Sequence, residues 1–292
     1  MREVDYCSAA RIDLCELAPQ GILEEDSLAA VTRVVEAALA NPLVHTLCLT
    51  GSEETFLHGA DRRQFARWTA ADDLQALMEF TQRANALLTR IARSPKRTVA
   101  WIEGIAAGAG LELALSCKEI IAGPRARFRL PETALGIYPG MGGTQRLPRR
   151  LGKGLAKMMI YTGAIVPADA AWPIGLVDRR VDAGTTLEQL LGQPVRQEKA
   201  PARAEKWQLL EPFFNTYTIE QLLDERFPAP GDGVLQRARC DLLRMPASAL
   251  LAAERAIDGG FRLPLEDGLA LEMAGLPDIF RTPEARQRLA AE

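Results

Sequence analysis

The 292-residue sequence has few of the residues that metal centres and disulfide frameworks require. It contains two histidines, His45 and His58, and five dispersed cysteines, without a CxxC pair or the Cys/His spacing of a zinc site. An odd number of cysteines argues against a disulfide framework and favours a reducing compartment. The GxSxG motif of a serine nucleophile is absent too. We therefore expect neither a metal ion nor a serine–histidine nucleophile.

Long apolar runs are also missing. No stretch of the sequence approaches the roughly 20 apolar residues that a transmembrane helix needs, and the N-terminal segment MREVDYCSAARIDL carries charges in place of a signal-peptide core. The net charge of −3 favours neither nucleic acid nor an anionic membrane as a partner. We expect a cytoplasmic protein without a nucleic-acid or membrane partner. With 48% hydrophobic residues, the chain can build a substantial core.

The spacing of apolar residues predicts strands that alternate with helices. Strands are expected at 9–16, 43–50, 97–104, 119–122, 127–130 and 176–180, and helices at 24–39, 72–93, 110–117, 143–150, 153–161 and 167–172. This alternation is typical of an α/β fold with mostly parallel strands, and residues 9–16 are expected at a sheet edge.

Beyond residue 203 the pattern predicts helices alone. They are expected at 203–213, 218–225, 232–245, 247–258 and 265–275. The polar segment 183–203 between the two parts is interpreted as a linker. We place a boundary near residue 190, which gives a core of residues 1–190 and a helical C-terminal region of residues 191–292.

Two clusters of small residues lie close in sequence to two carboxylates. The clusters are GAG at 108–110 and GMGG at 140–143, and the carboxylates are Glu112 and Glu132 in otherwise apolar segments. Glycine lets backbone N–H groups approach a developing oxyanion, and carboxylates transfer protons. The pattern therefore predicts a reaction at a carbonyl group. Either glutamate taken alone would more often be an ordinary residue of a helix start.

Four motifs carry a resemblance to a known family. They are FLHGAD at 56–61, GIAAGAGLELALSC at 104–117, FRLPETALGIYPGMGGTQRLPRRLG at 128–152 and AIVPADAAWPIGLVDRRV at 164–181. With them the sequence resembles the enoyl-CoA hydratase/isomerase (crotonase) superfamily over about residues 10–180. The resemblance implies an α/β fold with a crotonase-like ββα spiral core, and a helical C-terminal region that serves oligomerisation and covers the CoA. It also implies an acyl-CoA substrate, no separate cofactor, and a homotrimer or a dimer of trimers.

The resemblance assigns four residues to the chemistry. The backbone N–H groups of Ala60 and Ala109 would hold the thioester oxygen, and Ala109 keeps its donor if its φ angle is negative. Glu112 and Glu132 stand where the hydratases of the family have two glutamates. By analogy Glu112 activates a water molecule and Glu132 delivers a proton to C2 of the substrate.

Further residues of these motifs are expected near the substrate: His58, Gly59, Asp61, Gly108, Tyr138, Gly140 and Met141. Tyr138 and Met141 are expected to line an acyl pocket, with core packing as the alternative. His58 could instead pack within its loop, and Asp61 could cap a helix. Cationic side chains considered for an anionic or phosphorylated ligand are Arg62, Arg63, Arg146, Arg149, Arg150 and Lys153, each with a structural or solvated role as the alternative.

The expected reaction is the addition of water across the 2,3 double bond of a 2-trans-enoyl-CoA, which gives a 3-hydroxyacyl-CoA. Residues 213–227, FFNTYTIEQLLDERF, resemble a segment of 3-hydroxyisobutyryl-CoA hydrolases, so a thioester hydrolase is an alternative. Such hydrolases usually have an aspartate at the place of Gly140 and commonly lack the glutamate found at 112, which favours the hydratase. An enoyl-CoA isomerase needs only one of the two acids and stays open. The non-enzyme alternative is an RNA-binding or structural member, against which the intact glutamate pair argues.

Overall fold

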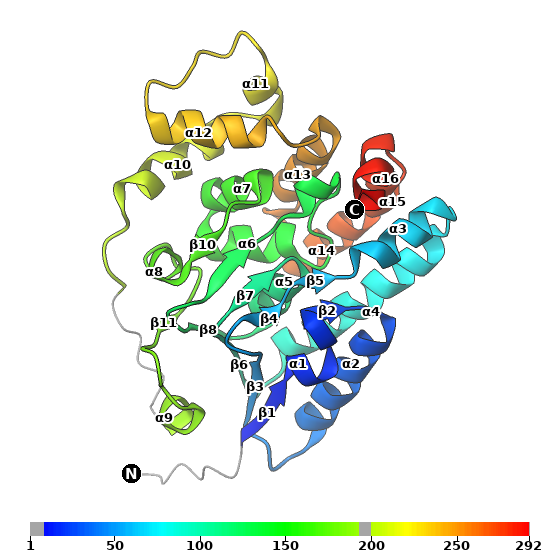
Figure 1. The fold of residues 1–292 in the computed structure, drawn as a ribbon, viewed down its shortest axis with the longest axis vertical. Helices are drawn as coiled ribbons and strands as arrows, with labels where there is room; N and C mark the ends of the chain where they lie inside the picture. The colour runs from blue at the N-terminus through cyan, green and yellow to red at the C-terminus, as the bar shows by residue number, and fades with distance from the viewer. Residues whose placement is uncertain (1–8, 193–199, 292) are drawn as a thin grey trace.

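A computed structural model describes residues 9–192 and 200–291 of the chain (Figure 1). Its larger sheet has five strands in the order β1-β3-β6-β8-β11, all of them parallel. The strands are β1 (Ala9–Asp13), β3 (Thr46–Thr50), β6 (Arg97–Ile102), β8 (Glu119–Ala122) and β11 (Arg179–Arg180). The predicted parallel sheet with the first strand at its edge is thereby confirmed.

A second sheet of four strands has the order β10-β9-β7-β4, and only the β9–β10 pair is antiparallel. Its strands are β4 (Thr55–Leu57), β7 (Ile105–Ala107), β9 (Arg127–Arg129) and β10 (Val166–Pro167). The strand predicted at 97–104 is divided, because the chain leaves β6 and enters the second sheet as β7. Gly104 permits this crossing, since a Cβ atom there would lie 2.0 Å from the carbonyl carbon of Glu54. The pairs β3–β4, β6–β7 and β8–β9 each supply one strand to each sheet, which makes the ββα spiral.

The helices of the N-terminal part pack around these sheets. They are α1 (Leu14–Leu17), α2 (Glu25–Ala40), α3 (Arg62–Ala70), α4 (Leu74–Arg93) and α5 (Ala109–Ser116). The strand predicted at 9–16 is wrong beyond Asp13, because the Asp13 carboxylate accepts a hydrogen bond from the N–H of Cys15 and begins α1. The helix predicted at 72–93 is confirmed as α4; the Asp73 side chain caps it, and its buried residues recur at helical spacing.

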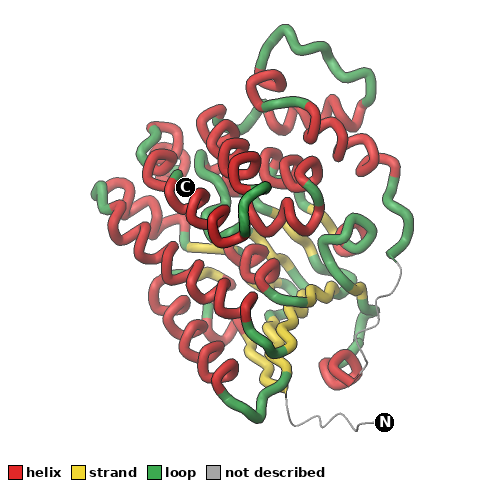
Figure 2. The backbone as a smooth tube through the Cα atoms, turned by 180° about the vertical axis from the view of Figure 1, so that it is seen from behind, coloured by secondary structure: helices red, strands yellow, loops and turns green. Residues whose placement is uncertain are grey.

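The helices that follow in the chain lie mostly beyond one end of the strands, although α8 packs beside β10 (Figures 1 and 2). They are α6 (Gly143–Leu151), α7 (Lys153–Thr162), α8 (Ala168–Ala171), α10 (Glu205–Thr216), α11 (Ile219–Leu223), α12 (Gly233–Leu242), α13 (Ala247–Gly260), α14 (Leu265–Ala274), α15 (Leu276–Phe280) and α16 (Pro283–Ala290). The predicted C-terminal helices are confirmed with shifted ends. Helix α10 packs closely on α7, since a Cβ at Gly154 would lie 2.0 Å from the carbonyl oxygen of Glu211.

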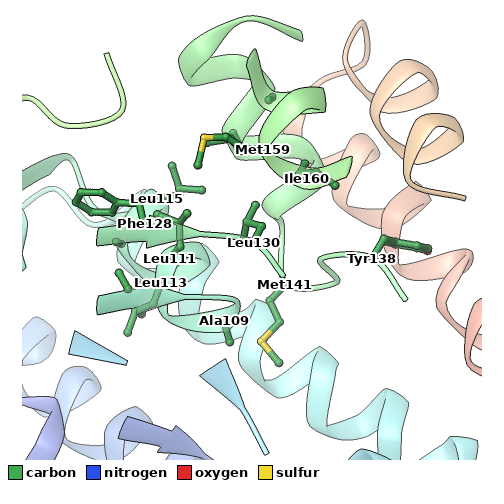
Figure 3. Packing of buried hydrophobic residues seen from close by; sticks show 14 of the residues in the cluster. Ala109, Leu111, Leu113, Leu115, Phe128, Leu130, Tyr138, Met141, Met159 and Ile160 are labelled. Carbon is green, nitrogen blue, oxygen red and sulfur yellow. The ribbon is translucent and has the colours of Figure 1, made fainter. Parts of the chain in front are cut away.

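The segment expected as a linker contains helix α9 (Leu187–Gly192), and its residues 193–199 lie outside the described residues. The division of the chain near residue 190 therefore stays a prediction. One buried apolar cluster includes residues from Ile12 in β1 to Leu289 in α16. Figure 3 shows part of this cluster, to which α5 contributes Leu111, Leu113 and Leu115 and α7 contributes Met159 and Ile160. Within the described ranges, no helix is long and apolar enough to cross a membrane.

Candidate active site

Two backbone segments with positive-φ glycines meet at the start of α5. Gly59, in strand β5 (Gly59–Ala60), has φ +121°, and a Cβ there would lie 3.4 Å from the nitrogen of Ala109. Gly108, with φ +51°, is the N-cap of α5, and Ala109 is the first residue of that helix. Ala109 is not among the residues with positive φ, as its expected role as a donor requires. First-turn N–H groups have no partner within their helix. The N–H of Ala109 therefore has no acceptor within α5.

One cavity of about 80 Å³ brings together nearly all of the predicted site residues. It is lined by His58, Gly59, Ala60, Gly108, Ala109, Glu112, Glu132, Tyr138, Gly140 and Met141. Asp61 is not part of this lining. Its carboxylate accepts a hydrogen bond from the N–H of Arg63, 2.9 Å away, and begins α3, which is the capping role that was the alternative for this residue.

The glycine loop of residues 140–143 holds the side chain of Glu112. Every residue of α5 is buried, and Glu112 is only 2% exposed. Its Oε1 accepts hydrogen bonds from the N–H groups of Met141 at 2.8 Å and Gly143 at 2.7 Å. Burial raises the pKa of Glu112 to about 7, although these two hydrogen bonds and the charge of Arg146 favour the ionised form. Such a carboxyl group changes its protonation state near neutral pH, as a general acid or base requires.

Glu132 approaches the same cavity from the first residue of a short 3-10 helix, Glu132–Leu135. Its Oε1 lies 2.8 Å from the place where a Cβ on Gly108 would stand, so a side chain at Gly108 would displace this carboxyl group. Its Oε2 is buried and has no hydrogen-bond partner among the described residues. Burial and, next, the negative charge of Glu112 raise the pKa of Glu132 well above its usual value. The two carboxyl groups therefore resist simultaneous ionisation.

The two residues expected in an acyl pocket point in different directions. Figure 3 shows Met141 directed towards Ala109, whereas Tyr138 is directed towards the C-terminal helices. The Tyr138 hydroxyl donates a hydrogen bond to the carbonyl oxygen of Glu272, 2.7 Å away. His58 is exposed at the rim, with Nε2 3.2 Å from Thr55 Oγ1, so it both lines the cavity and packs within its loop.

Most of the cationic candidates bind other parts of the protein. Arg62 lines the cavity, whereas Arg63 and Lys153 do not. Lys153 forms an ion pair with Asp258, and Arg150 forms one with Asp178. Arg149 donates to the carbonyl oxygens of Gly260 and Leu263, and Arg146 donates to that of Met141. These four side chains therefore connect structural elements, as their structural alternatives predicted.

Some residues of the site, Glu272 foremost, were not predicted from the sequence. Glu272 in α14 is fully buried, and its carboxylate accepts hydrogen bonds from the N–H groups of Gly142 and Thr144 and from the Thr144 hydroxyl. Burial and the charge of Glu112 raise its pKa to about 8. Leu276 and Phe280 of α15 form part of the cavity wall. One feature of the sequence could have pointed to Glu272: it is a carboxylate within the apolar stretch LALEMAGL of a predicted helix. No group of three or more potential metal ligands occurs in the part of the chain that the structure describes.

Solved structures share this fold. The chain superposes on a carnitinyl-CoA dehydratase from Mycobacterium thermoresistibile with a TM-score of 0.80 at 21% identity, covering 96% of this chain and 86% of that one. It superposes on an enoyl-CoA hydratase from Rhodobacter sphaeroides 2.4.1 with a TM-score of 0.77 at 20% identity, covering 91% and 81%. The protein therefore has the α/β crotonase fold, with parallel sheets and C-terminal helices.

The family follows from the sequence match. The model of the enoyl-CoA hydratase/isomerase family matches residues 10–214, and the chain belongs to this family, which is part of the crotonase superfamily. It is 37% identical over 169 residues to a crotonyl-CoA hydratase of Syntrophomonas wolfei, covering 58% of this chain and 64% of that protein. It is 38% identical over 174 residues to the 2,3-dehydroadipyl-CoA hydratase of Escherichia coli K12, covering 60% and 66%. The matches thus span slightly less than two thirds of these relatives.

Proposed function

We propose that the protein is an acyl-CoA hydratase that adds water across the 2,3 double bond of a 2-trans-enoyl-CoA to give a 3-hydroxyacyl-CoA. The observation that carries the proposal is the presence of the buried carboxyl group of Glu112 and the partly buried one of Glu132 in one cavity with the backbone of Ala60 and Ala109. Membership of the enoyl-CoA hydratase/isomerase family supports an acyl-CoA substrate.

In this proposal, the thioester oxygen accepts hydrogen bonds from the N–H groups of Ala60 and Ala109. When the water oxygen bonds to C3, electron density moves through the double bond onto the thioester oxygen and forms an enolate. The two N–H donors bind this enolate more strongly than they bind the substrate. The N-terminal end of α5 adds its partial positive charge at the same place. Loss of one such donor costs about 3 kcal/mol of transition-state stabilisation.

The two glutamates divide the proton transfers. Ionised Glu112 takes a proton from water while the water oxygen bonds to C3, and protonated Glu132 gives its proton to C2. The product gains one oxygen and two hydrogens, and a proton moves from Glu112 to Glu132 before the next turnover. Glu112 is suited to the first task because its Oε1 is held by the loop, whereas Oε2 accepts no hydrogen bond from the described residues.

The cavity wall favours an apolar acyl chain. Phe65, Leu135, Ile137, Leu276 and Phe280 line it together with the site residues. These side chains offer an uncharged acyl group a favourable surface, because apolar contacts replace contacts with water. The name of one relative specifies crotonyl-CoA, a thioester of this kind. We infer that crotonyl-CoA is a suitable first substrate for assay.

The hydrolase alternative receives no support from the segment that suggested it. Within residues 213–227, Phe213, Tyr217 and Phe227 pack on one another with ring centroids 4.9–6.3 Å apart, and none of the three lines the cavity. At Gly140, the position where those hydrolases have an aspartate, the carbonyl oxygen accepts a hydrogen bond from Asn85. The isomerase and the non-enzyme alternatives remain hypotheses, as does the expected homotrimer or dimer of trimers.

The test is the hydration of crotonyl-CoA, followed as the loss of enoyl-thioester absorbance. Glu112→Gln and Glu132→Gln should each lower kcat by about 10²- to 10⁴-fold. Glu103→Gln is the matched control, because Glu103 is another carboxyl group with a pKa raised by burial but lies outside the cavity. Full activity in both site variants would overturn the mechanism. Release of free CoA from a 3-hydroxyacyl-CoA, without hydration, would instead establish a hydrolase.

A further inference from the structure

The loop formed by residues 141–144 is held from two sides by two buried carboxylates. Its four successive N–H groups alternate between them: Met141 and Gly143 donate to Glu112, and Gly142 and Thr144 donate to Glu272. All four distances lie between 2.7 and 3.0 Å. Glu112 comes from α5 in the spiral core, whereas Glu272 comes from α14 in the C-terminal region.

This loop needs external acceptors because it contains the start of a helix. Gly142 is the N-cap of α6, with φ +102°, and Gly143 and Thr144 are the first two helical residues. Their N–H groups have no partner within the helix, and a buried N–H without an acceptor costs about 1–3 kcal/mol. Glu272 satisfies Gly142 and Thr144, so these two donors are not free to compete for Glu112.

Glu272 is itself fixed in place. It is fully buried, and its carbonyl oxygen accepts the Tyr138 hydroxyl. The end of α14 approaches closely there, since a Cβ on Gly275 would lie 2.6 Å from the Tyr138 oxygen. On the other side of the loop, Arg146 donates to the carbonyl oxygen of Met141 at 2.9 Å. Three side chains therefore set the position of the loop. Glu112 lines the cavity, whereas Glu272 and Arg146 do not.

From this geometry we infer that Glu272 is a positioning residue: by holding Gly142 and Thr144, it keeps the N–H groups of Met141 and Gly143 aimed at the Glu112 carboxylate. The C-terminal region thus completes the catalytic site without touching the substrate through this side chain. The kinetic part of the inference rests on the proposed hydratase function, whereas the structural part does not.

The structural part is tested by amide hydrogen exchange, read by mass spectrometry, in Glu272→Gln. Glutamine keeps the size of the side chain, but its NH₂ group would face one of the two loop donors. We expect peptides that contain residues 141–144 to exchange at least about tenfold faster, because a broken hydrogen bond of about 1.4 kcal/mol has that effect. The matched control is Glu254→Gln, since Glu254 of α13 also accepts a backbone N–H, that of Ile219, but lies outside the cavity.

Unchanged exchange of the loop in Glu272→Gln would overturn the inference. Equal acceleration throughout the protein in both variants would also overturn it, because that result shows general destabilisation. These outcomes do not depend on any activity. If the exchange behaves as expected and the wild type fails to hydrate crotonyl-CoA, then the proposed function fails and the positioning of the loop stands.

The kinetic part is tested by a double-mutant cycle with Glu112→Asp. A shorter aspartate withdraws from the Met141 and Gly143 N–H groups, so release of the loop should cost little further activity in that background. We expect Glu272→Gln to lower kcat about tenfold in the wild type, with KM nearly unchanged, and less than about twofold beside Glu112→Asp. Equal losses in both backgrounds would show that Glu272 does not act through Glu112. Glu254→Gln should keep the wild-type kcat.

Discussion

The burial of Glu112 predicts that the site lowers the stability of the protein at alkaline pH. Its pKa rises from 4.5 to about 7 on folding, so between these values the folded protein holds a proton that the unfolded chain has lost. The free energy of unfolding therefore falls as the pH rises from about 4.5 through 7, by roughly 3 kcal/mol in total. Glu112→Gln removes the titrating group while its carbonyl oxygen can still accept from Met141 and Gly143.

Urea unfolding at about pH 5.5 and pH 8.5 measures this effect. Over this interval Glu112 stays ionised in the unfolded chain and loses its proton in the folded protein, which corresponds to roughly 2 kcal/mol. We expect the stability of Glu112→Gln relative to the wild type to rise by this amount between the two pH values. The protein concentration must be equal in all samples, because an oligomer gains stability with concentration.

The difference between the two proteins reports Glu112 together with its charge coupling, because Glu132 and Glu272 titrate in both proteins but lose the part of their pKa shift that the charge of Glu112 causes. Their raised pKa values should make the wild type and the variant alike less stable at high pH. The reasoning would be refuted if the two proteins lost the same stability between the two pH values, since Glu112 would then not be a buried titrating group. The variant should at the same time lose most of its hydratase activity, so stability and activity change in opposite directions.

Three glycine substitutions, one of them a control, test the fit of the backbone. Gly108→Ala places a Cβ 2.8 Å from Glu132 Oε1 at a φ of +51°, so kcat should fall at least about tenfold. The control is Gly175→Ala, at a φ of +85° with no atom within 4 Å of the new Cβ. It should lower the free energy of unfolding by only about 1–2 kcal/mol and leave kcat unchanged. Gly154→Ala places a Cβ 2.0 Å from the carbonyl oxygen of Glu211, so it should lower the free energy of unfolding by about 1–3 kcal/mol. Equal kcat values for the first pair, or an unchanged urea midpoint for Gly154→Ala, would contradict the packing described above.

Local pattern was sufficient for the elements that have a regular apolar face. The helices at 72–93 and 247–258 were predictable because buried residues recur at helical spacing along them. The strand at 97–104 was predicted too long, since nothing in its run of residues shows that the chain changes sheets at Gly104. The strands β4 and β5 and the helix α3 were missed, because they are short or begin within a motif that was interpreted as a loop.

The site was predictable where the family motifs are continuous in sequence. Glu112, Glu132 and the backbone of Ala60 and Ala109 fall within such motifs, and the structure places all four around one cavity. Their catalytic roles remain a proposal for experiment. The motifs could not separate the capping role of Asp61 from substrate binding, since both need a polar residue at the start of a helix.

The sequence by itself determined the alternation of strands and helices, the glycines that admit backbone donors, and the pair of carboxylates. Each of these depends on residues close together in the chain, where side-chain type and spacing act directly on the backbone. Only the tertiary structure decided that Glu272, 160 residues after Glu112, holds the other side of the same loop. A buried hydrogen bond between distant segments depends on how the helices pack, and the spacing of residues along the chain does not contain that information.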